Sequence, residues 1–209
     1  MAKNDFIEVS RQELEFGSMY IDTNNPKFEL NYLYVDSENV VCTNTRALSV
    51  VSHQNVGVRS DLKLYIPKEV VVDALKKKLA VKFYLENASI TCINAEGIEF
   101  MKISGVEMSS GCYPDYKRIV GKVNKDSHPF TQLDQITGII ASKMVEVDKK
   151  YIPKFKGEYM GRVHFGADDS GYEYAPVQIK FVETYTMRNV RLIMMPIVDT
   201  FKEFKEGKI

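Results

Sequence analysis

The sequence predicts an α+β protein with two domains, in which antiparallel sheets carry a few helices. Three observations support this prediction. Short segments that alternate between apolar and polar residues recur along the chain, which is typical of half-buried strands. Helical patterns interrupt these segments at intervals. The 209 residues are enough for two domains of about a hundred residues each.

The first predicted elements are a strand and a capped helix. Residues 6–9 alternate and predict the strand. Ser10 and Glu13 follow at the spacing of a capping box, so a helix is expected to begin there and to continue to about Ile21. Alternation and turn residues then predict strands over residues 28–35, 39–51 and 62–66.

A second helix is predicted over residues 68–78. Pro67 suits the start of a helix, because its missing N–H would have no partner there. One buried stripe is expected from the apolar residues at helical spacing, Val71, Val72, Leu75 and Leu79. Strands are then predicted over residues 80–85, 88–94 and 97–106. The order of a strand, a helix and further strands thus occurs twice, which indicates a first domain of two similar halves.

The pattern restarts at Asp126, where a shorter second domain is expected. A helix over residues 132–144 is predicted by Leu133, Ile136, Ile139, Ile140 and Met144. A basic and aromatic connector at 149–157 precedes strands near 161–165, 174–182 and 190–195. Only about ninety residues follow residue 120, and no second helical pattern is evident among them. We therefore expect a complete domain at 1–120 and a shortened one at 121–209.

Composition and motifs argue against several functional classes. The formal net charge is zero, which does not favour tight direct DNA binding. There is no apolar run of membrane-spanning length and no secretory signal pattern, so we expect a cytoplasmic protein without a membrane partner. The three cysteines, Cys42, Cys92 and Cys112, lie far apart, which argues against disulfides and structural zinc.

Catalytic motifs are also missing from the sequence. His53, His128 and His164 are scattered, without the spacing of metal ligands, and no Gly-rich phosphate loop occurs. We therefore expect a binding protein with no catalytic residue, no metal and no cofactor. A small-molecule enzyme on an unrelated α+β fold is the remaining alternative.

Three distant segments carry a resemblance to one protein family. They are Thr43-Asn44-Thr45-Arg46-Ala47-Leu48, residues 111–120 with the run Pro114-Asp115-Tyr116, and Arg191-Leu192-Ile193-Met194-Met195-Pro196-Ile197. In this order they resemble segments of the bacterial sliding clamp, the DNA polymerase III beta subunit. The resemblance covers the family's second domain from about Phe6 to Val120, and more thinly its third domain. It implies a DNA-clamp fold of two clamp-like domains with helices on one face of antiparallel sheets, as in a shortened clamp from a mobile element.

In that family, such segments line a groove that binds peptides of DNA polymerases and of the clamp loader. The resemblance assigns this groove to Leu30, Thr43, Thr45, Leu48, Pro114, Arg118, Ile119, Ile193, Met194, Met195 and Pro196. Leu, Ile and Met give adaptable apolar walls, and Arg118 suits a peptide carbonyl or carboxylate at the rim. Residues 45–47 differ from the family's usual Gly-His-Arg, so a different partner is expected. The alternative is that these are ordinary core and linker residues.

The resemblance also implies a DNA-facing side. In clamps, helices line the central hole, and the matching cations here are Arg11, Lys68, Lys76, Lys77, Lys78, Lys143, Lys149 and Lys150. Their contacts would be to phosphates and independent of sequence. The alternative is that these lysines are simply solvated. The C-terminal residues Phe201 and Phe204 are either an internal competitor for the groove or part of a solvated end.

The function implied is that of a processivity factor, which tethers a polymerase to DNA. Clamp rings contain six domains, so a two-domain chain would close a ring as a head-to-tail homotrimer. The second hypothesis is an adaptor or decoy that keeps the peptide groove and never encircles DNA.

Overall fold

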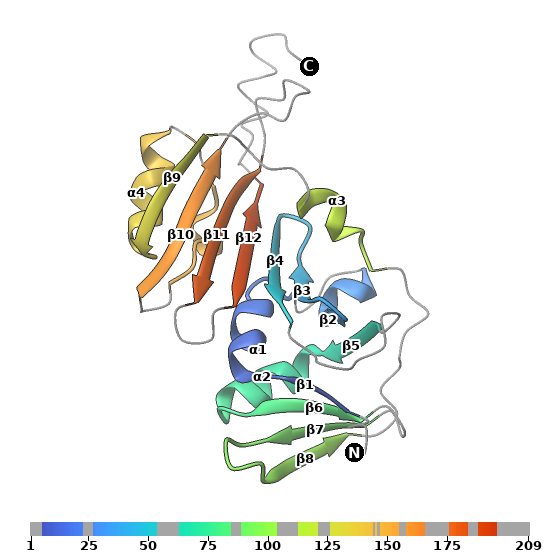
Figure 1. Cartoon of the computed structure of the whole chain (residues 1–209). Coiled ribbons are helices and arrows are strands. Elements are labelled where there is room, and N and C mark those ends of the chain that lie inside the picture. The colour runs from blue at the N-terminus through green and yellow to red at the C-terminus, as the bar shows by residue number, and fades with distance from the viewer. Residues whose placement is uncertain are drawn as a thin grey trace.

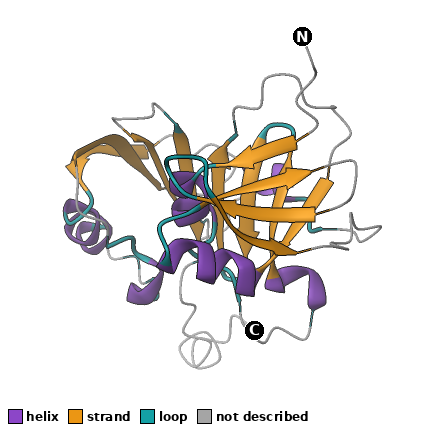
Figure 2. Ribbon diagram, turned by 90° about the horizontal axis from the view of Figure 1, so that it is seen from below, coloured by secondary structure: helices purple, strands orange, loops and turns teal. Residues whose placement is uncertain are grey.

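The computed structural model describes residues 6–22, 27–53, 63–84, 89–103, 113–120, 126–143, 145, 147–154, 158–165, 176–183 and 188–195. Strands make up most of this part, and the short helices lie beside them (Figures 1 and 2). The strands are β1 (Phe6–Val9), β2 (Tyr32–Asp36), β3 (Asn39–Thr43), β4 (Ala47–Ser52), β5 (Lys63–Pro67), β6 (Ala80–Tyr84), β7 (Ser89–Ile93), β8 (Glu99–Ile103), β9 (Asp126–Gln132), β10 (Glu158–Phe165), β11 (Val177–Glu183) and β12 (Asn189–Met194). The helices are α1 (Arg11–Gly17), α2 (Lys68–Lys76), α3 (Tyr116–Val120) and α4 (Gln135–Ser142), with 3-10 segments at η1 (Phe28–Asn31) and η2 (Lys149–Tyr151).

The chain repeats one unit, a strand, a helix and three strands. The first unit is β1-α1-β2-β3-β4, the second is β5-α2-β6-β7-β8, and the third is β9-α4-β10-β11-β12. The two similar halves that the sequence predicts for residues 1–120 are therefore present. The third unit has the same order, although its first strand was not predicted, since only a helix was expected around residues 132–144.

The first two units exchange their first strands, whereas the third keeps its own. β1 pairs with β6 of the second unit, and β5 pairs with β2 of the first. In the third unit β9 pairs with β10, so it fills the place that an exchanged strand takes in the other two. The third unit therefore forms four paired strands, β9 to β12, without a strand from another unit. This explains how the shortened second domain forms a stable sheet.

One long sheet joins the proposed domains. A four-stranded sheet has the order β1-β6-β7-β8, and an eight-stranded sheet has the order β5-β2-β3-β4-β12-β11-β10-β9. The junction is the antiparallel pairing of β4 with β12, in which Leu48 lies opposite Ile193. Both proposed domains therefore share one continuous ladder of backbone hydrogen bonds.

The main core lies between the helices and the sheets. It contains Leu14 and Phe16 of α1, Val71 of α2, Ile136 of α4 and strand residues from all three units. α1 contacts strands of both sheets, β4 and β3 on one side and β6 on the other. Gly17 permits this approach, because a Cβ at this position would lie 2.6 Å from Val40 Cγ1. The expected helices on one face are α1, α2 and α4, while α3 packs on the opposite face of the eight-stranded sheet.

Ser10 and Glu13 form the predicted capping box, but α1 ends at Gly17 and not near Ile21. Tertiary contacts of Tyr20 explain the early end. Its N–H lies 3.1 Å from Cys42 Sγ, and its hydroxyl donates a hydrogen bond of 2.6 Å to the Tyr151 carbonyl. The residue is thereby held in a turn against the core rather than in a further helical turn.

Other predicted boundaries also shift. The strand predicted over 28–35 begins with the 3-10 segment η1, and the strand over 39–51 is a hairpin of β3 and β4. The hairpin turns at Thr45, whose φ is 75°, and the Asn44 side chain accepts hydrogen bonds from the backbone N–H groups of Arg46 and Ala47. Gln132, the first residue of the helix predicted over 132–144, is the last residue of β9 instead, and α4 begins at Gln135. The parts of predicted strands at 85, 88 and 104–106 fall outside the described residues.

Candidate partner-binding site

The three segments singled out in the sequence come together at the junction of β4 and β12. Thr43 of β3 lies opposite Leu48 of β4, and Leu48 lies opposite Ile193 of β12. Beyond the strand ends, the Met195 N–H donates a hydrogen bond of 2.9 Å to the Arg46 carbonyl. Residues 113–120 cross this face of the sheet, and Tyr116 packs in one cluster with Leu48 and Ile193. Segments that lie far apart in the sequence thus form one surface.

The buried floor of this surface, here called the junction floor, contains Tyr34, Val41, Leu48, Val50, Tyr65, Tyr116 and Ile193. Tyr113 stacks on Tyr34, with ring centroids 4.6 Å apart and 8° between the planes. The hydroxyl of Tyr116 donates a 2.6 Å hydrogen bond to Asp36 Oδ2 and accepts one of 3.1 Å from Asn39. Burial, with smaller effects of the Asp36 and Tyr65 charges, raises the pKa of Tyr34 to about 12. Burial likewise raises the pKa of Tyr113 and of Tyr116, so these three hydroxyls stay neutral at physiological pH.

The rim around the junction floor combines apolar and cationic side chains. Ile119 is 42% exposed and Met195 is 46% exposed, although large apolar side chains are usually covered. Pro114, Arg118 and Thr45 are exposed as well. An apolar rim over a rigid aromatic floor is suited to an apolar peptide side chain, with Arg118 available to a carbonyl or carboxylate.

One predicted groove residue takes another position. Met194 is fully buried in the main core on the helix side, because side chains alternate along β12 and Ile193 occupies the other face. Met194 therefore does not line this surface. Leu30 is buried in η1 before β2, and its place in the groove stays a prediction. Pro196 lies outside the described residues.

The predicted DNA-facing cations lie on or after the helices, mostly exposed. Arg11 starts α1, Lys68 and Lys76 lie on α2, and Lys77 and Lys78 follow it. Three others lie near α4 or in η2, namely Lys143, Lys149 and Lys150. Local carboxylates offset two of them, since Lys143 Nζ lies 2.8 Å from Asp126 and Lys150 Nζ lies 2.8 Å from Asp148. The remaining six have no ion pair within the described part of the chain.

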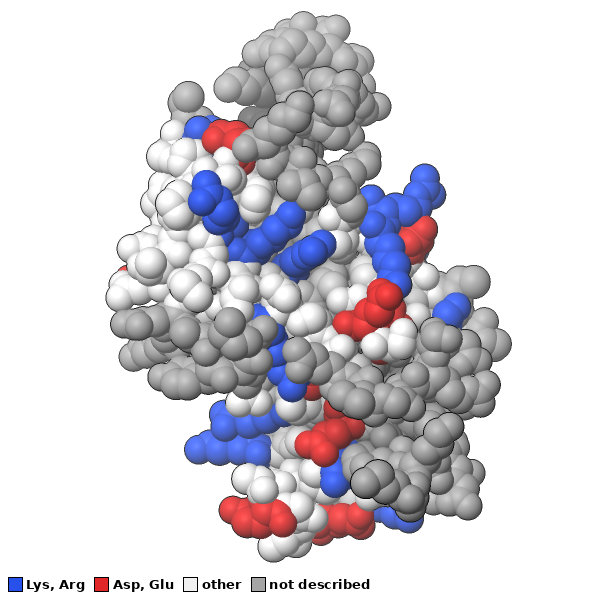
Figure 3. All heavy atoms as spheres, viewed as in Figure 1, with Lys and Arg blue, Asp and Glu red and all other residues white. Residues whose placement is uncertain are grey.

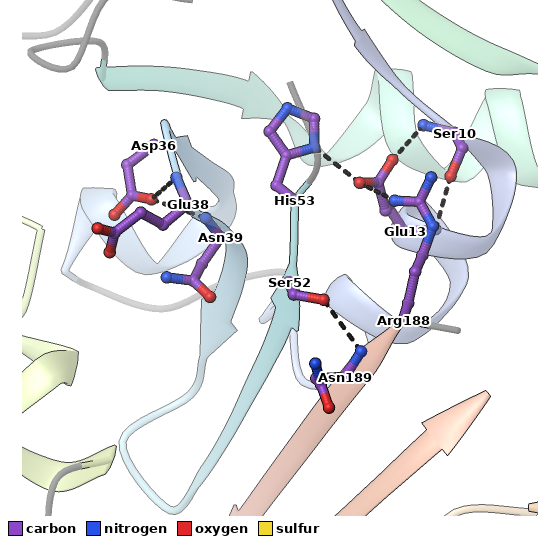
Figure 4. Close-up of polar contacts among 9 residues, drawn as sticks. All are labelled: Ser10, Glu13, Asp36, Glu38, Asn39, Ser52, His53, Arg188 and Asn189. Carbon is purple, nitrogen blue, oxygen red and sulfur yellow. Dashed lines mark hydrogen bonds and ion pairs between the residues drawn. The ribbon is translucent and has the colours of Figure 1, made fainter. Parts of the chain in front are cut away.

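Sequence reasoning missed a buried ionic cluster near the same junction (Figure 4). Glu13 of the capping box is 1% exposed. Its Oε2 accepts a 2.6 Å hydrogen bond from the Ser10 N–H, and its Oε1 lies 2.7 Å from His53 Nδ1 and pairs with Arg188. His53 follows β4 and Arg188 precedes β12, so the cluster joins α1 to both strands of the junction. The signal in the sequence that could have indicated this cluster was weak, a histidine and an arginine beside apolar strands.

Several forces act on the ionisation of Glu13. Burial alone would raise its pKa, but the hydrogen bond and charge of His53, the charge of Arg188 and the Ser10 N–H together bring it below the ordinary value of 4.5. The carboxylate is therefore ionised at neutral pH, and its hydrogen bonds together with the Arg188 charge compensate its burial.

The arrangement of sheets and helices defines a class of protein, because it is the fold of DNA sliding clamps. No protein-family model and no curated protein matches this sequence. Solved structures do match. The Helicobacter pylori beta clamp in complex with 3,4-difluorobenzamide aligns over 95% of this chain and 67% of its own, with a TM-score of 0.59 and 16% identity. The DNA polymerase sliding clamp of Caulobacter crescentus aligns over the same shares, with a TM-score of 0.57 and 14% identity.

A third structure, the H. pylori beta clamp bound to a DNA ligase peptide, has a TM-score of 0.54 and 15% identity over 95% of this chain and 67% of its own. The chain therefore has the sliding-clamp fold and spans about two thirds of the length of these clamps. No helix in the described ranges has the length and apolar character needed to cross a bilayer.

Proposed function

We propose that this protein is a clamp-type binding protein, not an enzyme, which holds peptide segments of DNA polymerases and clamp loaders at the junction surface. The observation that carries the proposal is the exposed apolar rim of Ile119 and Met195 around the buried junction floor. One protein of the same fold is described as bound to a DNA ligase peptide, which supports peptide binding as the use of such a surface. Tethering a polymerase in this way raises its effective concentration at the primer end.

Replacing Met195 by aspartate is expected to weaken binding of a fluorescent clamp-binding peptide by at least about tenfold, because a charge at the rim must be desolvated against an apolar side chain. Pro114→Asp is expected to act in the same direction. Both residues are exposed, so both variants should keep a cooperative melting transition close to that of the parent.

Fluorescence anisotropy measures the affinity, and Lys102→Asp is the control, since Lys102 is exposed on β8 in the other sheet. If Met195→Asp and Pro114→Asp both bound the peptide as tightly as the parent, the peptide would bind at another site.

A specific observation favours a second candidate, an adaptor that binds clamp partners without encircling DNA. Closure of a ring requires an edge strand free for pairing at each end of the subunit. β8 is an edge strand, and Phe100 within it and Ile98 just before it are each 58% exposed, which suits pairing with another copy. β9, the edge of the eight-stranded sheet, carries Pro129, which lacks an N–H and is typical of edges protected against pairing. β9 also takes the position that a strand exchanged from a second half would occupy.

Retention on DNA separates the two candidates. A closed ring loaded on nicked circular DNA stays bound in gel filtration and is lost when the circle is linearised, because a ring slides off free ends. Light scattering should then give the mass of a closed homotrimer. For the adaptor we expect peptide binding with no difference between circular and linear DNA, and a mass below that of a trimer.

A further inference from the structure

A row of three cations crosses β10, β11 and β12 on the face of the eight-stranded sheet opposite to α1, α2 and α4. Arg162 of β10 lies opposite Lys180 of β11, and Lys180 lies opposite Arg191 of β12. Alternate residues of the same strands, such as Val163 and Ile179, point into the main core, so the three cations point away from it. Figure 3 shows Lys and Arg side chains gathered over these strands. We call this set the basic row.

Among the residues that the structure describes on this face, no acidic side chain lies next to the basic row. Directly opposite residues of antiparallel strands have Cβ atoms about 5 Å apart, and like charges in such pairs destabilise a sheet. The neighbouring positions on this face are Met160, His164, Gln178, Val182 and Asn189, none of them acidic. Among the described residues, the three cations form no ion pair. The row therefore costs stability, which indicates that an anion compensates it.

The contacts and surroundings of the row support this view. Arg162 is held by hydrogen bonds of 3.0 Å and 3.2 Å to the hydroxyl and carbonyl of Ser127, which orients its guanidinium. Burial, together with the Arg191 charge, lowers the pKa of Lys180. The row lines a depression of about 460 Å³, in which apolar side chains border the cations. Met160 is one of them and is 60% exposed.

We propose that the basic row binds an acidic peptide segment of a partner protein, with at least two carboxylates and one aliphatic side chain. Arginine side chains bind carboxylates through two parallel hydrogen bonds, and Lys180 adds a point charge between them. The aliphatic side chain packs on Met160 and Val182, which a sugar-phosphate backbone would leave exposed. Bases of single-stranded nucleic acid stack on aromatic platforms; of the aromatic side chains that line the depression, Phe181 is buried in the core, which leaves the half-buried His164 imidazole.

The test measures anisotropy of a labelled peptide of about ten residues that alternates glutamate and leucine. Lys180→Glu and Arg191→Glu are expected to weaken binding by about tenfold or more each, and raising the salt concentration should weaken binding to the parent. Lys76→Glu is the control, because Lys76 is exposed on α2 at the helix side. Met160→Ser should weaken binding of this peptide but not of one in which serine replaces leucine.

Thermal unfolding of Lys180→Gln tests the repulsion within the basic row. This variant should melt at a higher temperature than the parent, because it removes repulsion between like charges.

Unchanged peptide affinity in both glutamate variants would overturn the proposal. Tighter binding of a single-stranded DNA of equal charge, with Met160→Ser having no effect on either ligand, would also overturn it in favour of a nucleic-acid site. If inorganic phosphate at the same concentration of charge displaced the labelled peptide completely, the proposal would also be overturned, because the basic row would then bind anions without regard to the peptide. The proposal does not depend on the peptide groove, and Met195→Asp should leave this binding intact.

Discussion

Replacing Glu13 by alanine is expected to lower the free energy of unfolding by about 3–5 kcal/mol, the typical cost of breaking a buried ion pair by removing one partner. The variant leaves His53 and Arg188 without their shared carboxylate, and the His53 side chain is almost fully buried while that of Arg188 is 18% exposed. It also removes the Glu13 half of the capping box, which leaves the Ser10 N–H unpaired. Urea unfolding followed by circular dichroism measures the loss.

Glu15→Ala is the matched control, since Glu15 lies in the same helix without a described ion pair, and we expect a change within about 0.5 kcal/mol. An equal loss in both variants would mean that the cluster contributes nothing specific.

The same residue predicts a pH dependence. Its pKa is lower in the folded state than the ordinary 4.5, so its ionised form contributes stability above that pH. This contribution is lost as the pH falls through the folded-state value, because the carboxylate must then take up a proton. Glu13→Gln should therefore show a smaller loss of stability between neutral and acidic pH than the parent. A parallel pH profile in the two proteins would contradict the assignment.

Tyr116→Ala is the second large effect that we expect, a loss of about 3–5 kcal/mol from removing a buried aromatic side chain. Tyr116 fixes the crossing segment on the junction floor through its ring and through its hydrogen bond to Asp36. Because the segment also carries Pro114 and Ile119, the rim should lose its geometry, and binding of the clamp peptide should fall together with stability.

Tyr116→Phe separates packing from hydrogen bonding. It keeps the ring but leaves Asp36 Oδ2 without its donor, so a smaller loss of about 1–3 kcal/mol is expected. Tyr84→Phe is the control, since the Tyr84 hydroxyl makes an exposed hydrogen bond to Glu99 and should contribute little. If Tyr116→Phe and Tyr84→Phe lost equal stability, the Asp36 hydrogen bond would have no special role at the junction.

The three repeated units give the shortened chain its architecture. In the first two, each half depends on a strand from the other, so neither forms its sheet alone. The third unit needs no such partner, because β9 pairs within the unit and β12 pairs with β4. The junction surface, the ionic cluster and the basic row all lie on or beside β12, which is why this strand combines the candidate functions of the molecule.

Several features of the fold and the site followed directly from local patterns. The capping box at Ser10 and Glu13, the helix after Pro67 and the paired halves of the first domain are signals of a few neighbouring residues. The resemblance of three segments to sliding clamps also predicted which segments come together. Local rules could not give the early end of α1 or the core position of Met194, because both depend on what packs against the residue.

The amino-acid order by itself determined most of the strands, the helices α1, α2 and α4 and the α+β class, since hydrophobic periodicity and turn chemistry act within a few residues. Only the tertiary structure decided which strands exchange, which side of β12 faces the floor, and which ionisable groups meet. Glu13, His53 and Arg188 are far apart in the sequence, and so are the three cations of the basic row. Their proximity comes from strand register, which depends on long-range pairing across the whole sheet.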